Sequence, residues 1–345
     1  MAESADMSHK LALAVLLLAL APPALADDSM AALGTGGLIL EKTDKVVLRA
    51  EDLYLSTREV RISYRFFNKT SQDLPVTIAF PMPDITGDVN FTVAVPDASA
   101  ANFLKFETKV DGKPVTSQVE QRAFYKAQGK PEVEITAELA ALGLPMMPTA
   151  AGKALNALPA DKRQPLIDKG YVAPDTYNSG KGWQTDYVGM WTMRSKFFRQ
   201  QVFPAGKEVL VEQRYQPSVG ALAGTIAGTE SFKGEEKARY LKTWCTDEDF
   251  LRSANALSEA MLKDTAGNHN VNEQYLSYVI TSGGNWAGPI GDFRLVIDKG
   301  YADNLVSFCG TGVKKIAPTQ FEMRFKDYVP KRDIDILLLQ RHFEP

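Results

Sequence analysis

The sequence predicts a mainly β protein of the α+β class, with two antiparallel β-sandwich-like regions and a helical insertion between them. Runs of alternating apolar and polar residues occur on both sides of the middle of the chain, and a period of two is typical of half-buried strands. Residues 117–175 contain instead a stretch rich in Ala, Leu and Pro. One later stretch has apolar residues at helical spacing.

The first element of the chain, residues 1–26, is predicted to be a secretory signal peptide. Lys10 precedes an uncharged run over residues 11–26, and this run ends on an Ala-Leu-Ala triplet. A basic start, an apolar centre and an A-x-A end are typical of such signals. The run is shorter than the about 20 apolar residues of a membrane span, which makes a retained anchor helix the weaker alternative. We expect cleavage after Ala26, a periplasmic location and no membrane span in the processed chain.

The charge balance excludes one class of partner. The formal net charge is −3, so the chain lacks the basic excess of a nucleic-acid-binding protein. Hydrophobic residues make up 45% of the sequence, which is ordinary for a globular protein that buries a core. No nucleic acid is therefore expected among the partners, and the oligomeric state is left open.

The N-terminal β region is predicted over residues 27–116. Alternation is clearest at 60–66 and 76–80, and the polar turn between them predicts an antiparallel hairpin. A further strand is expected at 46–55. Asp111-Gly112 predicts a second, tighter hairpin, because this dipeptide suits a two-residue turn.

The helical insertion is predicted over residues 117–175. Val119, Ala123 and Ala127 would lie on one side of a first helix. Shorter helices should follow, because several prolines interrupt the Ala- and Leu-rich stretch and each proline removes a helical hydrogen bond.

The C-terminal region, residues 176–345, is predicted to be β-rich with one amphipathic helix. Runs at 197–203 and 209–215 flank a Pro-Ala-Gly turn and predict a third hairpin. The helix is expected to begin near Thr246, with Asp249 completing a weak capping box. Later strands are predicted at 275–281, 293–297, 305–308, 321–325 and 334–339.

The two cysteines, Cys245 and Cys309, are expected to form a disulfide, because an even pair in an exported protein is more often bonded than free. Such a bond would stabilise the fold by about 4 kcal/mol in the chain-entropy model. Two buried thiols or one reactive thiol are the alternatives.

Catalytic and metal-binding motifs are scarce. The processed chain has only His269 and His342, neither in a ligand motif, so no metal, cofactor or catalytic residue is assigned. Asp84 and Asp88 could act as general acid and base or bind calcium, but a solvated turn is the favoured interpretation. Whether the protein is an enzyme stays open, and this scarcity favours a non-catalytic role.

A glycine-rich segment over 282–292 is the best candidate for a recognition surface. It contains Asn285 and Trp286, and an exposed tryptophan offers a rigid face for a sugar or a protein. Trp183 and Trp191 flank a second candidate edge. Packing in the core is the competing and favoured interpretation for these tryptophans, since aromatic residues more often pack than bind.

Several strings together resemble a bacterial family known as domain of unknown function 4424. The resemblance covers nearly all of the chain after residue 26 and implies an exported, periplasmic protein, with no activity, cofactor or catalytic residue to transfer. The strings that carry it are Gly36-Gly37-Leu38, Glu51-Asp52-Leu53, 60–68, 79–84, 214–220, 285–290 and Phe308-Cys309-Gly310.

The first β region is also similar, more faintly, to the VIT domain of inter-alpha-trypsin-inhibitor heavy chains. Two strands ending in Phe-x-Asn and Phe-Pro-x-Pro are followed by residues 110–115 and Tyr125 in the same order. This resemblance implies a β-sandwich scaffold without enzymatic activity. No D-x-S-x-S metal motif follows, so metal-dependent adhesion is not supported.

These observations favour a non-catalytic envelope module that binds a protein or glycan partner. The alternative is a carboxylate-dependent hydrolase of envelope glycans or peptides. A third interpretation is a purely structural envelope factor without a soluble ligand.

Overall fold

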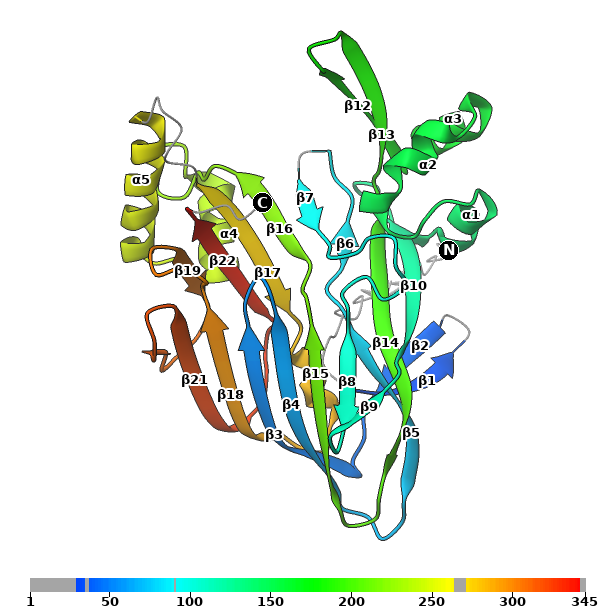
Figure 1. Ribbon diagram of the computed structural model, residues 1–345, viewed down its shortest axis with the longest axis vertical. Coiled ribbons are helices and arrows are strands. Elements are labelled where there is room, and N and C mark those ends of the chain that lie inside the picture. Colours follow the sequence, from blue (N-terminus) through cyan, green and yellow to red (C-terminus); the bar gives the residue numbers. More distant parts are fainter. Residues whose placement is uncertain (1–28, 35–36, 90, 264–270, 342–345) are drawn as a thin grey trace, which may run out of the picture.

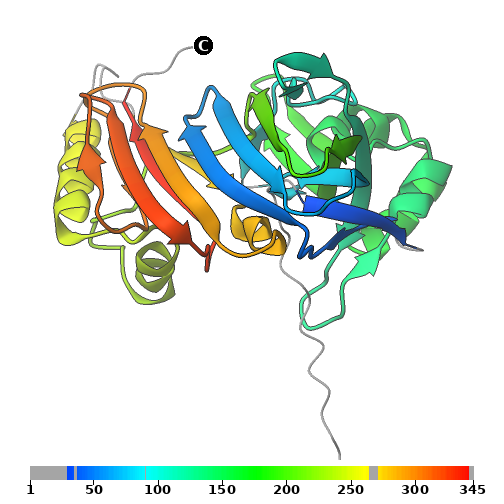
Figure 2. The ribbon, with the colours of Figure 1, turned by 90° about the horizontal axis from the view of Figure 1, so that it is seen from below.

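The computed structural model describes residues 29–34, 37–89, 91–263 and 271–341, and antiparallel sheets dominate it (Figure 1). The predicted mainly β class is confirmed. The predicted signal peptide, His269 and His342 lie outside the described residues. Seen from below, helices α4 and α5 lie at one end of the molecule and α1–α3 at the other (Figure 2).

An eight-stranded sheet, called here the wide sheet, takes strands from both predicted β regions. β3 pairs with β4 in antiparallel fashion and with β18 in parallel. Sheet membership therefore does not follow the predicted limits 27–116 and 176–345. The strand order is β20 (Lys314–Lys315), β21 (Gln320–Tyr328), β18 (Ile290–Asp298), β3 (Val46–Leu55), β4 (Val60–Asn68), β15 (Glu208–Tyr215), β8 (Glu107–Val110), β9 (Lys113–Val115).

A second sheet packs against the inner face of the wide sheet. Phe66 of the wide sheet lies 5.5 Å from Phe203 of the second sheet, measured between ring centroids. Both rings belong to one buried apolar core. The order is β11 (Val133–Glu134), β10 (Gln118–Tyr125), β14 (Thr192–Phe203), β5 (Leu74–Pro81), β1 (Ser29–Gly34), β2 (Gly37–Glu41), and β6 (Ile85–Thr86) pairs with β14.

Two of the predicted hairpins are wrong. β4 pairs with β3 and β15, whereas β5, the next strand, pairs with β14 and β1 in the second sheet. In the same way β14 and β15 lie in different sheets. Each polar turn therefore carries the chain from one sheet to the other. Alternation predicts which face a strand buries but not which strand it pairs with, because two facing sheets bury the same apolar positions. The tight hairpin at Asp111-Gly112 is confirmed as β8–β9.

The first helix predicted in the insertion is also wrong. Residues 118–125 form β10, and residues 118–124 of it pair with β14. Val119 and Ala123 are four residues apart, a spacing that fits the period of a strand as well as that of a helix. The helices of this region are shorter and start later, around a small core that includes Leu139, Leu155 and Leu166. They are α1 (Thr136–Ala141), η1 (Pro148–Ala150), α2 (Gly152–Ala157) and α3 (Ala160–Asp168).

A third sheet lies beside helices α4 (Gly234–Trp244) and α5 (Glu248–Lys263). α4 is not among the predicted helices. α5 begins two residues after the predicted cap Thr246, and Asp247 is its capping residue, because its side chain accepts a hydrogen bond from the Phe250 amide. The sheet order is β19 (Leu305–Phe308), β22 (Ile334–Gln340), β17 (Asn272–Tyr278), β16 (Val219–Ala223), β7 (Thr92–Ala94), and η2 (Thr281–Asn285) follows β17.

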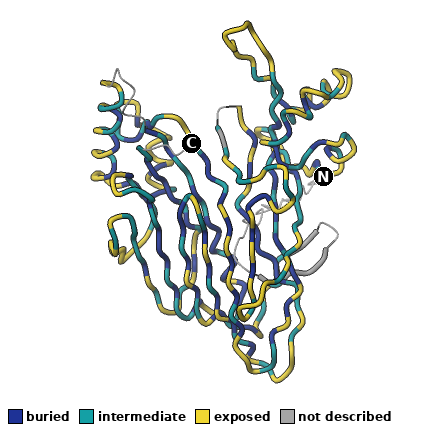
Figure 3. The backbone as a smooth tube through the Cα atoms, viewed as in Figure 1, coloured by how far each residue is buried: buried dark blue, intermediate teal, exposed yellow. Residues whose placement is uncertain are grey.

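A two-stranded hairpin, called here the arm, projects from the body beside α2 and α3 (Figure 1). It consists of β12 (Val172–Asn178) and β13 (Trp183–Gly189), which pair with each other over their whole length. Toward its tip the arm is exposed, and only its base is buried (Figure 3).

Candidate functional site

Trp286 and Asn285, the leading candidates for a recognition surface, are buried. Trp286 is 3% exposed, and its ring centroid lies 4.6 Å from that of Phe66. The Asn285 carbonyl accepts a hydrogen bond from the Thr43 amide. The glycine-rich segment therefore closes one end of the core between the two large sheets, which is the packing alternative raised from the sequence.

The other two tryptophans have opposite surroundings. Trp191 is fully buried beside the short helices, and its indole nitrogen donates to the Met146 carbonyl at 2.8 Å. Gly189 leaves room for this ring, because a Cβ there would lie 2.5 Å from it. Trp183 is 75% exposed at the tip of the arm. The structure therefore does not gather the four predicted binding residues into one site.

The predicted disulfide between Cys245 and Cys309 is confirmed. It joins the residue that ends α4 to the residue that follows β19, with 5.0 Å between the Cα atoms. The Arg332 guanidinium donates to the Thr243 carbonyl beside the bond. The bond therefore ties a helix to the third sheet.

Asp84 and Asp88 have different surroundings. Asp84 accepts a hydrogen bond from Arg194 at 3.1 Å, and the same guanidinium donates two bonds of 2.8 Å to Glu132. Desolvation raises the pKa of Asp84 and outweighs the opposing effect of Arg194. Asp88 lies in the lining of a separate cleft, at the base of the arm.

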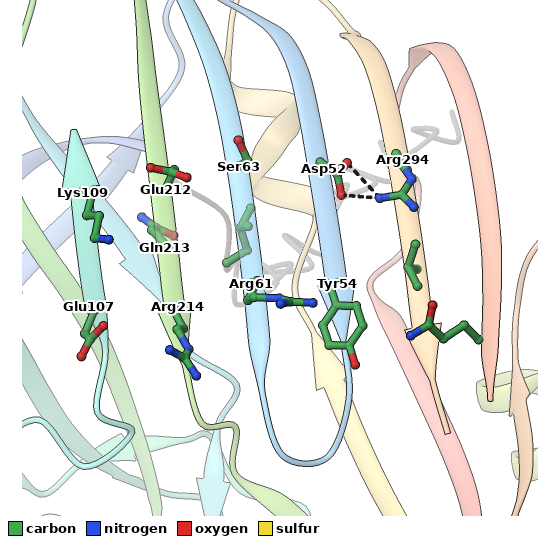
Figure 4. A pocket seen from close by; sticks show the side chains of 13 residues that line it. Asp52, Tyr54, Arg61, Ser63, Glu107, Lys109, Glu212, Gln213, Arg214 and Arg294 are labelled. Atoms are coloured by element: carbon green, nitrogen blue, oxygen red, sulfur yellow. Dashed lines mark hydrogen bonds and ion pairs between the residues drawn. The ribbon is translucent and has the colours of Figure 1, made fainter. Parts of the chain in front are cut away.

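A hollow of about 550 Å³ lies on the outer face of the wide sheet (Figure 4). Side chains at alternate positions of a strand point to the same face, so neighbouring strands supply its lining in register. Most of the lining is charged or polar. The lining residues are Asp52, Tyr54, Arg61, Ile62, Ser63, Glu107, Lys109, Glu212, Gln213, Arg214, Arg294, Val296 and Gln320.

The strand register arranges the outward side chains of the hollow in two rows that run across the strands. The first row is Lys109, Glu212, Ser63, Asp52 and Arg294. The second row is Glu107, Arg214, Arg61, Tyr54 and Val296. Neighbouring strands lie about 4.8 Å apart, so each row offers a polar group at close intervals.

One side of the hollow is held by charge-assisted contacts. Arg294 donates to both oxygens of Asp52, at 3.0 and 3.1 Å, and to Glu322 at 2.8 Å. The Arg61 guanidinium lies 4.3 Å from the centroid of the Tyr54 ring. Desolvation and a hydrogen bond to an aspartate raise the pKa of the Tyr54 hydroxyl. These contacts hold the guanidinium groups of Arg294 and Arg61 and the ring of Tyr54 in place before any ligand binds.

The other side of the hollow has polar side chains that can still form hydrogen bonds. Among the residues that the structure describes, the side chains of Ser63, Glu107, Lys109 and Glu212 form no hydrogen bond or ion pair. They supply both donors and acceptors, since lysine donates, carboxylates accept and a hydroxyl does both.

The sequence contains a weak signal for this hollow. Polar residues alternate with apolar ones in each of its strands, as in Arg61, Ser63 and Glu212, Arg214. Such alternation marks any wet sheet face. The alternation does not reveal the order of the strands in the sheet, and this order places the lining residues side by side. It brings together residues about 240 positions apart in the sequence, such as Asp52 and Arg294.

A second polar cluster is buried between α4 and the third sheet. Glu273 is fully buried and accepts hydrogen bonds from Thr225, Tyr240 and Tyr275. Desolvation and this carboxylate raise the pKa of both tyrosines. The three hydroxyl donors satisfy a carboxylate that would otherwise be costly to bury, so the cluster stabilises the packing of α4 on the third sheet.

Two further features bear on function. No helix within the described ranges is both long and apolar enough to cross a membrane. The described residues also contain no group of three His, Cys, Asp or Glu side chains placed to hold a metal ion.

Comparison with known proteins identifies a family. A family model described as "Domain of unknown function (DUF4424)" matches residues 26–337, nearly the whole chain. A search of curated proteins finds no match.

Two solved structures show distant similarity. One, from Legionella pneumophila and named as a candidate nutrient binding protein, has 12% identity and a TM-score of 0.38, over 90% of this chain and 72% of that one. The other, an M1 zinc metallopeptidase from Deinococcus radiodurans, has 9% identity and a TM-score of 0.21, over 86% of this chain and 43% of that one. Scores of this size do not establish a common fold.

Proposed function

We propose that this chain, which belongs to the DUF4424 family, is an exported, non-catalytic binding module of the cell envelope, and that it binds a glycan in the hollow of the wide sheet. Export rests on the signal-like residues 1–26, and the Cys245–Cys309 disulfide is compatible with an oxidising compartment. The hollow provides the observation that favours a glycan as the ligand.

That observation is the set of uncommitted donors and acceptors on one side of the hollow. Lys109 can donate, Glu107 and Glu212 can accept, and Ser63 can do both. A sugar carries hydroxyl groups that donate and accept at short intervals. Such a ligand can satisfy both kinds of group at once, which a purely anionic or purely apolar ligand cannot.

The size and chemistry of the hollow favour a glycan over a protein partner. A volume of about 550 Å³ falls within the range of small-ligand sites, which is roughly 300–1,000 Å³. The centre of a protein interface is depleted of charged residues and enriched in aromatic ones. Here Tyr54 is the aromatic residue in the lining, and Arg61 lies over its ring.

The test is calorimetric titration of the purified protein with oligosaccharides released from envelope glycans. We expect Glu212→Gln and Lys109→Ala each to weaken binding by about tenfold or more, about 1.4 kcal/mol, because each removes a charge-assisted contact. Glu259→Gln on α5 is the matched control, since Glu259 is an exposed carboxylate outside the hollow, and this variant should bind normally. Absence of binding across the whole oligosaccharide panel would remove the proposal.

A second candidate function is a carboxylate-dependent glycan hydrolase. The observation that favours it is the presence of Asp52, Glu107 and Glu212 in one hollow, since such enzymes use two carboxyls roughly 5–10 Å apart. Release of new reducing ends from the same oligosaccharides, abolished by Glu212→Gln or Glu107→Gln, would identify a hydrolase. Recovery of intact ligand after incubation identifies a binding module.

A further inference from the structure

The hollow on the wide sheet adjoins two further hollows, one at each of its ends along the strands. Asp52, Ser63 and Arg294 lie at one end of it, and Glu107 and Arg214 lie at the other (Figure 4). The first three residues also line a second hollow, and the other two line a third. The three hollows therefore follow one another along the strands and form one polar groove.

The second hollow, called here the arginine hollow, has a volume of about 250 Å³. Besides the shared residues its lining includes Arg65 and Asp292. The solvent-facing carboxylates of this lining already have cation partners in the same chain. Asp52 pairs with Arg294, and Asp292 pairs with Lys326 at 2.8 Å. A ligand therefore meets carboxylates that are already neutralised.

Arg65 is the cation of the arginine hollow without such a partner. Its side chain is exposed and, among the residues that the structure describes, forms no hydrogen bond or ion pair. The pKa of Asp292 is lowered first by its bond to Lys326 and also by the charges of Arg324 and Arg65. A guanidinium presents a planar set of donors that matches a carboxylate, so Arg65 can bind an acidic ligand group.

The third hollow, called here the lysine hollow, has a volume of about 420 Å³. It adds Lys105 and Glu59 to the shared residues Glu107 and Arg214. Glu59 accepts a hydrogen bond from Arg214. The side chains of Lys105 and Glu107 form no hydrogen bond or ion pair within the described part of the chain. This end of the groove therefore offers both a donor and an acceptor to sugar hydroxyl groups.

The strand register gives the length of the groove. Arg65 lies opposite Leu210 of β15. Lys105 lies beside Gln216, because the Gln216 amide donates to the carbonyl of the adjacent Leu104. Positions 210 and 216 are six residues apart, so the backbones of the two cations are separated by about 20 Å along the strands. A disaccharide is shorter than this, whereas a linear chain of several sugars can reach both ends.

We propose that the ligand is a linear acidic glycan that runs along the strands through all three hollows and places a sugar carboxylate on Arg65. This inference rests on the proposed glycan binding and adds the length and the charge of the ligand. Lys105 and Glu107 bind hydroxyl groups at the other end of the chain. Arg65 determines specificity, because a charge-assisted hydrogen bond in bidentate geometry is stronger than one between neutral groups.

The first test addresses length, by calorimetric titration with linear oligosaccharides released from envelope glycans and separated by size. We expect the affinity to rise with length until the fragment reaches both ends of the groove, and then to level off. Lys105→Ala should weaken binding of the long fragments at least about fivefold, because a hydrogen bond to a charged group is lost, and should leave the shortest binding fragments unaffected. Lys237→Ala is the matched control, since Lys237 is an exposed lysine on α4, outside the groove.

The second test addresses charge. Long acidic fragments are compared before and after chemical reduction of their carboxylates to alcohols. We expect reduction to weaken binding at least about tenfold, because it removes the charge-assisted contact. Arg65→Ala should weaken binding of the untreated fragments by a similar factor and have little effect on the reduced ones. Arg65 is exposed and forms no ion pair within the described ranges, so the variant should fold normally, which circular dichroism checks.

The outcomes separate this inference from the glycan binding on which it rests. Equal affinity for short and long fragments, or binding insensitive to carboxylate reduction or to Arg65→Ala, would overturn the inference. Binding that is still weakened by Glu212→Gln would then leave the hollow as the glycan site. Absence of binding at every fragment length would remove both proposals.

Discussion

At the scale of single residues, the neighbours of a side chain decide its role. Asn68 lies in a polar stretch that predicts a solvated turn, yet it is fully buried. Its amide group donates at 2.8 Å to the carbonyls of Gln72 and Phe203, and its oxygen accepts from Thr70. The side chain therefore holds together the two places where the chain passes between the large sheets.

Replacing this amide should be costly. Asn68→Ala is expected to lower the free energy of unfolding by roughly 2–3 kcal/mol, because it removes the buried hydrogen bond to the Phe203 carbonyl together with the contacts to Gln72 and Thr70. Urea unfolding followed by circular dichroism measures the change. Gln200→Ala removes one exposed hydrogen bond to Thr77 and should change stability by less than about 0.5 kcal/mol. A similar loss in both variants would contradict this role for Asn68.

Glu322 provides a pH prediction beside the hollow. Hydrogen bonds from Arg324 and Arg294 lower the pKa of its carboxyl. The pKa of this carboxyl is about 4.3 in the unfolded chain and lower in the folded protein. The ionised carboxylate therefore stabilises the fold at pH values above about 4.3, and this contribution is lost as the pH falls through the folded-state pKa.

Glu322→Gln should remove this contribution. The difference in unfolding free energy between wild type and variant is expected to be constant above about pH 5 and to shrink in more acidic solution. Its size should be about 1 kcal/mol or less, because solvent screens the arginines. Denaturant unfolding at a series of pH values measures it, and a difference that grows on acidification would refute the assignment.

At the scale of elements, strand positions were predictable and strand partners were not. Alternation placed β4, β5 and β15 close to their observed limits, whereas β14 begins five residues before the predicted start at 197. Each of these strands buries one face in the same core, so the pattern is equally compatible with a hairpin and with a passage between facing sheets. A helix was expected at 119–127, where the structure has β10. A spacing of four residues between apolar side chains fits the period of a helix and that of a strand.

The disulfide belongs to this scale because it joins α4 to β19. Cys245→Ser should lower the melting temperature under oxidising conditions. The two cysteines are 64 residues apart, and for this separation the chain-entropy model gives a loss of about 4 kcal/mol in the free energy of unfolding. Cys309→Ser should have the same effect, and reductant should bring the wild type to the level of the variants. Thermal unfolding with and without reductant measures this, and melting unaffected by reductant would contradict it.

At the scale of the whole molecule, the hollow and the arm lie on different parts of the fold. The hollow occupies the outer face of the wide sheet, whereas the arm projects beside the short helices (Figure 1). Trp183→Ala should therefore leave glycan binding intact, because the arm lies apart from the hollow.

The sequence by itself determined the mainly β class, most strand positions and the cysteine pairing, because these depend on local periodicity and on residue type. Only the tertiary structure decided which strands became neighbours, that Trp286 and Trp191 were buried while Trp183 was exposed, and that a polar hollow formed on one sheet. The physical reason is that hydrogen bonds between strands join backbone groups, which are alike in every residue. Partner choice therefore follows from the packing of the whole core and not from local sequence.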